Sequence, residues 1–195
     1  LSEFVQSERG SRMPPAKRVM LESRRQKRLR ALSLDSFQDY IDFVFDDSQK
    51  EAELLHMIDS VTTNKTDFFR ESDHFDYMTN RLLPERFRDG WGRDRPLRVW
   101  STASSTGEEP YTLAMVLEEF RGEHQGFNYG ILGTDISTRA LDHGRKAVYT
   151  EERVDPVPQS LRKKYLLRSK DRTSRLVRVR PELRKRVQFH RLNLM

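Results

Sequence analysis

The stretch from Leu97 to Tyr111 constrains the fold of this chain more than any other segment. An apolar run that favours a β-strand, Leu97–Ser101, enters a cluster of small residues, and the chain starts again at Pro110, which suits a first helical turn. Apolar residues then follow at helical spacing: Leu113, Ala114, Leu117 and Phe120. A strand, a tight loop and a helix in this order predict an α/β fold, in which ligands bind where such loops leave the carboxyl ends of the strands.

As a nucleotide-binding loop, this stretch is weakly specific on its own. It holds one glycine, Gly107, and lacks both the G-x-G-x-x-G pattern and a P-loop lysine. The next predicted strand, Phe127–Ile136, includes Asp135 near its end. An acidic residue at the end of the second strand of such a unit commonly binds ribose hydroxyls. The alternative is that Asp135 caps a helix that begins near Ser137.

A second informative stretch, Thr63–Glu71, places two aromatic residues among polar ones. Phe68 and Phe69 favour burial, whereas their polar neighbours cost free energy if they are buried without partners. One interpretation is the lid or wall of a cleft, anchored by the aromatic rings. The other is an ordinary helix N-terminus capped by Asn64 or Thr66.

The two stretches together resemble the signatures of the CheR family, the S-adenosylmethionine-dependent methyltransferases of chemotaxis receptors. Residues 62–71 are similar to T-N-x-T-x-F-F-R-[ED], and residues 100–111 are similar to W-[SC]-A-x-x-S-T-G-E-E-P-Y. The resemblance extends over essentially the whole chain. It departs at Thr102-Ala103-Ser104, where the family usually has small residues such as Ala-Gly-Cys.

The resemblance implies an α/β fold class with a small all-helical domain ahead of a Rossmann-like methyltransferase sheet. We expect the helical domain at residues 1–62, a cofactor-covering linker and helix at 63–96, and the methyltransferase domain at 97–195, with a small antiparallel β insertion at about 163–188. The family's next strand, which ends in C-R-N-[VL], is absent. We therefore expect an incomplete sheet, in a fragment that lacks the C-terminal part of the catalytic domain and is inactive alone.

The resemblance also implies a set of cofactor-contacting positions. Asp135 would bind the ribose, and Asn193 and Leu194 would lie near the adenine. The full set is Asn64, Thr66, Arg70, Glu109, Asp135, Asn193 and Leu194.

Arg70 is the residue that we expect to be catalytic. A guanidinium grips carboxylates through two hydrogen bonds, so Arg70 would orient the methionine end of the cofactor or the substrate carboxylate. The alternative is a structural salt bridge to Glu71 or Glu109.

The implied reaction is methyl transfer from S-adenosylmethionine to glutamate side chains of chemotaxis receptors, which forms methyl esters and S-adenosylhomocysteine. A glutamate with an ordinary pKa of about 4.3 is already ionised at neutral pH and needs no strong general base. Catalysis should come from alignment and from exclusion of water. The alternative function is a regulatory or binding module of the same family that senses the cofactor without turnover.

The charge of the chain favours an anionic partner. Its net charge is +6 and its isoelectric point is about 9.7. Basic residues crowd the predicted N-terminal helix, where Arg24, Arg25 and Arg28 are expected to recognise the acidic methylation helices of receptor cytoplasmic domains. The alternative is a solvated charged face. We expect no nucleic-acid partner, because residues 17–30 lack interleaved aromatic residues that could stack on bases.

Other features exclude several classes of protein. The chain has no cysteine, which excludes disulfides and thiolate chemistry, and its histidines lack metal-ligand spacing, so we expect no metal site. No apolar run is long enough to span a bilayer, and the first residues lack the apolar segment of a signal peptide, so we expect none. We expect a cytoplasmic protein without membrane insertion that is a monomer at full length, while the fragment could self-associate through a bare strand edge.

Periodicity predicts the remaining elements. A helix is expected at residues 73–83 with Phe75, Met78 and Leu82 inward, followed by a turn-rich connection from Pro84 to Pro96. A further helix is expected at residues 137–149. The two-residue alternation at 175–180 and 187–194 predicts strands.

Overall fold

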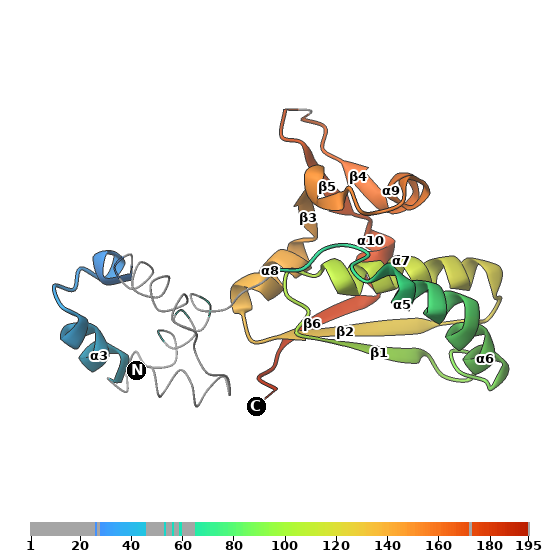
Figure 1. Cartoon of the computed structure of the whole chain (residues 1–195), viewed down its shortest axis with the longest axis horizontal. Coiled ribbons are helices and arrows are strands. Elements are labelled where there is room, and N and C mark those ends of the chain that lie inside the picture. The colour runs from blue at the N-terminus through green and yellow to red at the C-terminus, as the bar shows by residue number, and fades with distance from the viewer. Residues whose placement is uncertain are drawn as a thin grey trace. The chain divides into compact units, whose positions relative to one another are not determined.

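A computed structural model describes residues 26, 28–45, 53, 56, 59, 65–171 and 173–194 (Figure 1). The chain divides into two compact units, one made of Leu1–Thr63 with Asn193–Met195 and the other of Asn64–Leu192. In the first unit, residues 28–32 are helical, and α3 spans Phe37–Phe45. Within the described part of the chain, no helix has the length and apolar character needed to cross a membrane.

The second unit is built on a parallel sheet, which confirms the α/β prediction. The strands lie in the order β1-β2-β6, with bounds Leu97–Thr102, Tyr129–Asp135 and Val187–Arg191. Helices α7 (Glu108–Glu123) and α8 (Thr138–Lys146) follow β1 and β2 and pack on the same face of the sheet (Figure 1). The other face carries exposed side chains such as Trp100, which is 54% exposed.

The core of this unit lies between the sheet and α7. Met115, Leu117 and Phe120 of α7 are buried against Tyr129 and Ile131 of β2. Burial of each large apolar side chain contributes about 1.5–3 kcal/mol. The sheet and α7 therefore form the rigid body from which the connecting loops project.

The segment before the sheet is one helical run with a wider turn inside it. It comprises α5 (Ser72–Tyr77), the π-helix η1 (Met78–Leu82) and α6 (Leu83–Arg88). The prediction that Leu82 points inward is wrong, since Leu82 is 37% exposed and Leu83 is 4% exposed. A π-turn holds more residues than an α-turn, so the inward face moves along by one position.

The prediction that the connection begins at Pro84 is wrong, since Pro84 lies in the first turn of α6. The connection to β1 therefore starts after Arg88.

The predicted antiparallel insertion is present as a second sheet that stands apart from the main one (Figure 1). Its order is β3-β5-β4, with bounds Val148–Thr150, Leu176–Val179 and Leu166–Arg168. Short helices connect these strands to each other and to β6: η2 (Glu152–Val154), α9 (Gln159–Tyr165) and α10 (Pro181–Arg184).

The helix expected at residues 137–149 ends early. Helix α8 stops at Lys146, because Ala147 adopts a left-handed conformation with φ 53°. Tyr149 is therefore a strand residue of β3, and this strand precedes the expected insertion at 163–188.

The ring of Phe189, on β6, packs against the backbone of three glycines. A Cβ atom added to Gly107, Gly133 or Gly144 would lie about 2.9–3.2 Å from that ring. The 2.9 Å contact at Gly144 is one that real Cβ atoms essentially never make, and the contacts at Gly133 and Gly107 are tighter than nine in ten real Cβ contacts. The glycines thus bring α7, α8 and β2 close to β6, and the ring fills the space between them.

The helical unit contains an ion pair around a buried carboxylate. Arg28 donates from Nε to Oε1 of Glu53 at 2.8 Å and from Nη2 to Oε2 at 2.5 Å, while the Tyr40 hydroxyl donates to Oε1 at 2.8 Å. Glu53 is only 2% exposed. Burial opposes its ionisation, but the hydrogen bonds from Arg28 and Tyr40 outweigh burial and hold the pKa of Glu53 below its usual range.

We expect Arg28→Ala to lower the free energy of unfolding of the helical unit by about 3 kcal/mol, because the change leaves a buried carboxylate without its cation. Arg30→Ala is the matched control, since Arg30 is exposed on the same helix, and its effect should stay within about 0.5 kcal/mol. Thermal unfolding followed by circular dichroism measures both.

The same pair predicts a pH dependence. A carboxyl with a lowered pKa contributes stability above its unfolded-state pKa of about 4.3, and that contribution is lost as the pH falls through the folded-state value. The stability difference between wild type and Arg28→Ala should therefore shrink in acid. A difference that is unchanged at about pH 2 would contradict the structural role of the pair.

Candidate cofactor-binding site

The loop between β1 and α7 has a backbone conformation that needs external support. Ala103, Ser105 and Gly107 all have positive φ angles, of 52°, 50° and 96°. For residues other than glycine, this conformation costs about 1 kcal/mol each. Contacts from elsewhere in the unit must therefore hold the loop in place.

Asp135, at the end of β2, provides that support. Its Oδ2 accepts a hydrogen bond from the backbone N–H of Ser105 at 2.8 Å, and its Oδ1 accepts one from the N–H of Ser137 at 2.9 Å. The carboxylate is 6% exposed and so links the β1–α7 loop to the start of α8. The N-cap of α8 is Ser137, whose Oγ accepts from the N–H of Ala140. The interpretation of Asp135 as the cap is therefore wrong.

The loop presents polar groups that suit a ligand with ribose or carboxylate oxygens. The hydroxyls of Ser104 and Ser105 are buried and, among the described residues, have no hydrogen-bond partner. Helix α7 begins after Gly107 without a side-chain cap, and its first turn carries the carboxylates of Glu108 and Glu109 and a proline without an N–H, Pro110. The two serine hydroxyls can donate hydrogen bonds to the ribose oxygens of an adenosine-type cofactor.

The described part of the Thr63–Glu71 stretch, residues 65–71, packs against α7 and Tyr149, while its role as the wall of a cleft stays a prediction. Phe68 is 1% exposed, and its ring meets that of Tyr149 edge-on at 5.0 Å. The backbone N–H of Phe69, a residue with φ 53°, donates to Oγ1 of Thr112 on α7 at 3.1 Å. These contacts place the segment beside the first turns of α7.

Arg70 and Glu109 leave their charged groups accessible. Arg70 is 61% exposed at its side chain, and its Nε lies 4.0 Å from Oε1 of Glu71, which is the outer limit for an ion pair. Glu109 is exposed at the start of α7 and accepts a hydrogen bond from the Ser101 hydroxyl at 2.6 Å. The weak pair with Glu71 leaves the Arg70 guanidinium able to bind another carboxylate.

The other predicted site residues are placed less completely. Thr66 is half-buried and lies three residues before Phe69, whose backbone N–H donates to Thr112 of α7. Asn64 lies outside the described residues, as do Arg24 and Arg25. Asn193 and Leu194 follow β6 and are grouped with the helical unit, so their part in the site stays a prediction.

The sequence did not indicate the residues that hold the segment 65–71 against α7. Thr112 both accepts from Phe69 N–H and donates to the carbonyl of Glu108 at 2.8 Å. Tyr149 donates to the carbonyl of Thr106 at 2.8 Å and covers Phe68. A threonine inside an apolar helix face was the available signal, since such a hydroxyl needs a partner when buried.

The unit has a parallel sheet, a loop with unpaired buried hydroxyls after the first strand, and a buried acid at the end of the second strand. These features are typical of an α/β domain that binds a nucleotide-type cofactor. Comparison with protein families identifies the family within this class. Residues 64–195 match the S-adenosylmethionine-binding domain of CheR methyltransferases, and residues 1–62 match the all-alpha domain of the same family. The chain belongs to the CheR methyltransferase family.

Relatives from several bacteria are similar along the whole chain. A chemotaxis protein methyltransferase of Borreliella burgdorferi is 37% identical over 198 residues, covering 100% of this chain and 68% of its own length. Chemotaxis protein methyltransferase 2 of Pseudomonas aeruginosa is 39% identical, with 95% and 63% covered, and the Escherichia coli chemotaxis protein methyltransferase is 35% identical, with 100% and 65% covered. The chain thus spans about two thirds of the length of these relatives.

We expect Asp135→Asn to lower the free energy of unfolding by about 2 kcal/mol even without cofactor. The asparagine amide can accept from only one of the two N–H groups, and it turns an NH₂ toward the other. Asp142→Asn on the exposed side of α8 is the matched control. Denaturant unfolding measures both variants. An unfolding free energy of Asp135→Asn equal to that of wild type would show that Asp135 does not stabilise the loop and acts only in ligand binding.

Proposed function

We propose that this protein transfers a methyl group from S-adenosylmethionine to glutamate side chains of chemotaxis receptors, forming glutamate methyl esters. The observation that carries the proposal is the match of residues 64–195 to the family's cofactor-binding domain, together with the strained loop that Asp135 holds within it. The names of the relatives support the chemotaxis receptor as substrate. The protein would act in the cytoplasm, where the methylated receptor helices lie.

When bound, the cofactor would supply an electrophilic methyl group on a sulfonium sulfur, with S-adenosylhomocysteine as the leaving group for attack by a glutamate oxygen. The residues of this chain bind and align the reactants. Asp135 would take the ribose hydroxyls, and Arg70 would orient the methionine end of the cofactor or the substrate carboxylate. The substrate carboxylate is ionised at neutral pH, so the site needs to orient it and exclude water but need not remove a proton.

Arg70 is the proposed orienting cation. It extends from a segment whose backbone is fixed by Phe68 and Phe69, while its own charge is only weakly paired with Glu71. A weakly paired guanidinium can bind a carboxylate through two hydrogen bonds, and only the weak contact with Glu71 has to be broken. Asn64, Thr66, Glu109, Asn193 and Leu194 complete the proposed set of cofactor contacts.

The proposed receptor contacts lie on the basic N-terminal helix. Arg24, Arg25 and Arg28 would meet acidic methylation helices, with steering that salt should weaken. Arg28 already holds Glu53 through two hydrogen bonds. A loss of receptor binding in an Arg28 variant therefore needs the unfolding control described for that pair.

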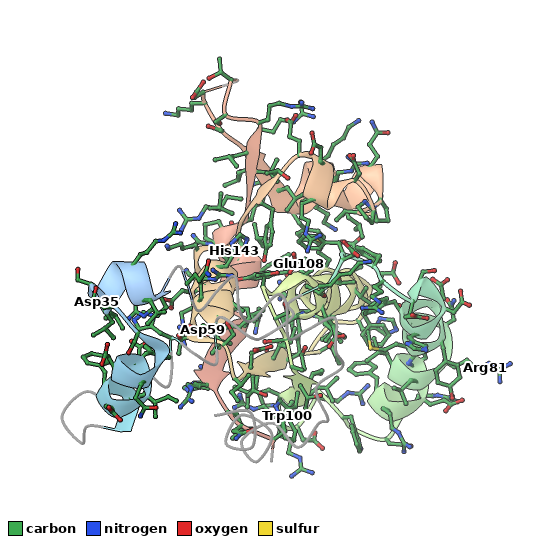
Figure 2. All side chains as sticks on the ribbon, turned by 60° about the vertical axis from the view of Figure 1, so that its left-hand side comes forward. Asp35, Asp59, Arg81, Trp100, Glu108 and His143 are labelled. Atoms are coloured by element: carbon green, nitrogen blue, oxygen red, sulfur yellow. The ribbon has the colours of Figure 1, made fainter. Side chains whose placement is uncertain are left out.

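We expect Arg70→Ala to lower methyl transfer by about 10- to 100-fold, the value of a lost hydrogen bond to a charged group, without a change in unfolding temperature. Arg81→Ala is the matched control, because Arg81 extends away from the molecule on the adjacent helical run (Figure 2). The assay uses labelled methyl transfer to receptor-containing membranes by the natural protein. Wild-type turnover in Arg70→Ala would remove the assigned role.

Titration of S-adenosylhomocysteine into the wild-type protein separates the two functions considered for the chain. Binding with methyl transfer supports the enzyme. Binding without transfer, in the natural protein supplied with receptor, would support the cofactor-sensing module. Absence of binding would contradict both.

A further inference from the structure

One arginine contacts two carboxylates that come from different parts of the site. Arg153, on η2 at the base of the antiparallel sheet, donates from Nε to Oε1 of Glu108 at 3.0 Å and from Nη1 to Oδ1 of Asp67 at 3.0 Å. Glu108 is the first residue of α7, and Asp67 lies within the Thr63–Glu71 stretch. The guanidinium thus bridges the segment 65–71 and the helix that follows the cofactor loop.

The Glu108 side of this bridge is firmly held. Glu108 is 1% exposed and lies among the packed side chains at the start of α7 (Figure 2). Its Oε2 accepts from the Thr106 hydroxyl at 2.6 Å, so both carboxylate oxygens have partners. Leaving the buried carboxylate of Glu108 without its cation is unfavourable, and this holds Arg153, whose side chain is 37% exposed, beside it.

The Asp67 side is more open, with the carboxylate 42% exposed. Asp67 lies between Thr66 and Phe68, directly before the two residues that are anchored by burial and by Thr112. The signature T-N-x-T-x-F-F-R leaves the position of Asp67 open. The contact with Arg153 is therefore a feature of this chain that the signature does not specify.

We propose that Arg153 is a positioning residue for the cofactor site: by binding Asp67 to Glu108, it holds the Thr66–Arg70 segment against α7 in the conformation that receives the cofactor. This inference rests on the proposed function, since it concerns the segment assigned to cofactor contact. It adds a residue from η2, which follows β3 of the antiparallel sheet, to a site otherwise built from the main sheet and the segment before it.

The physical effect is to lower the ordering cost of binding. Phe69 and Glu71 have left-handed backbones with φ 53° and 58°, so the segment holds a conformation that it would not keep alone. Each anchor present before binding removes part of the entropy that the cofactor would otherwise have to offset. Because Arg153 and Asp67 are partly exposed, salt should weaken their contribution.

Asp67→Asn tests the proposal most directly, because it removes the exposed ion pair and leaves the buried Arg153–Glu108 pair intact. We expect the dissociation constant for S-adenosylhomocysteine to rise about three- to fivefold, in line with a partly exposed ion pair, with little change in unfolding temperature. The wild-type affinity should fall with added salt more steeply than that of the variant. Isothermal titration calorimetry on the natural protein measures these affinities.

Amide hydrogen exchange provides a readout that needs no cofactor. In Asp67→Asn, exchange of residues 65–70 should be faster than in wild type, while the core of α7 should be unchanged. Arg168→Ala is the matched control, because Arg168 lies in the same antiparallel sheet and is 84% exposed, with a 3.5 Å contact to Glu151. It should alter neither the exchange of residues 65–70 nor the affinity.

Two further variants distinguish a loss of cofactor binding from a loss of folding. Arg153→Met combined with Glu108→Gln removes the bridge without leaving a buried charge, and it should weaken cofactor binding as Asp67→Asn does. Arg153→Lys retains the charge but lacks the forked guanidinium that reaches both carboxylates. Its unfolding temperature should therefore be closer to wild type than its affinity for S-adenosylhomocysteine.

The outcomes separate the inference from the function on which it rests. Wild-type affinity and wild-type exchange in Asp67→Asn would overturn the role of Arg153 while leaving the proposed function untouched. Failure of the wild-type protein to bind S-adenosylhomocysteine would overturn both. A fall in unfolding temperature alone, with affinity and exchange unchanged in every folded variant, would show that the bridge is structural only.

Discussion

The organisation of the α/β unit depends on one buried carboxylate. Asp135 accepts hydrogen bonds from the backbone amides of Ser105 and Ser137, and these amides belong to the loops that follow the first two strands. Without that link, the left-handed residues of the β1–α7 loop would relax toward ordinary conformations. The shape of the cofactor loop is thus fixed at the end of a neighbouring strand, where an ionised side chain serves two amides at once.

Much of the fold could be predicted because it follows from local patterns. The alternation around Leu176–Val179 and the apolar run at Leu97–Ser101 both became strands, and the helix after Pro110 formed as its spacing indicated. The errors lie where backbone geometry changes without a marked change in composition. The π-turn moved the buried position from Leu82 to Leu83, and a left-handed Ala147 ended α8 before Tyr149.

The site was predictable only in part, for a different reason. The motifs predict Arg70 and Asp135 as site residues, but they could not show that the Asp135 carboxylate supports the loop through two amides. Contacts between distant residues, such as Arg153 with Asp67, 86 positions apart, leave no periodic signal in a single sequence. Arg28 illustrates the same point, because a basic residue that suggested a recognition surface has a buried partner in Glu53.

The packing of Phe189 against three glycines limits how sequences of this kind can diverge. Gly107, Gly133 and Gly144 each stand within about 3 Å of the ring, counted from the Cβ atom that a larger residue would add. A larger residue at Gly144, where an added Cβ would lie 2.9 Å from the ring, needs a smaller side chain at position 189, and a smaller side chain there leaves a void beside the other glycines. Gly107 is restricted also by the backbone of Gly144, 3.0 Å from an added Cβ, and by its own φ of 96°. Positions 144 and 189 should therefore change together, while position 107 stays restricted whatever side chain stands at 189.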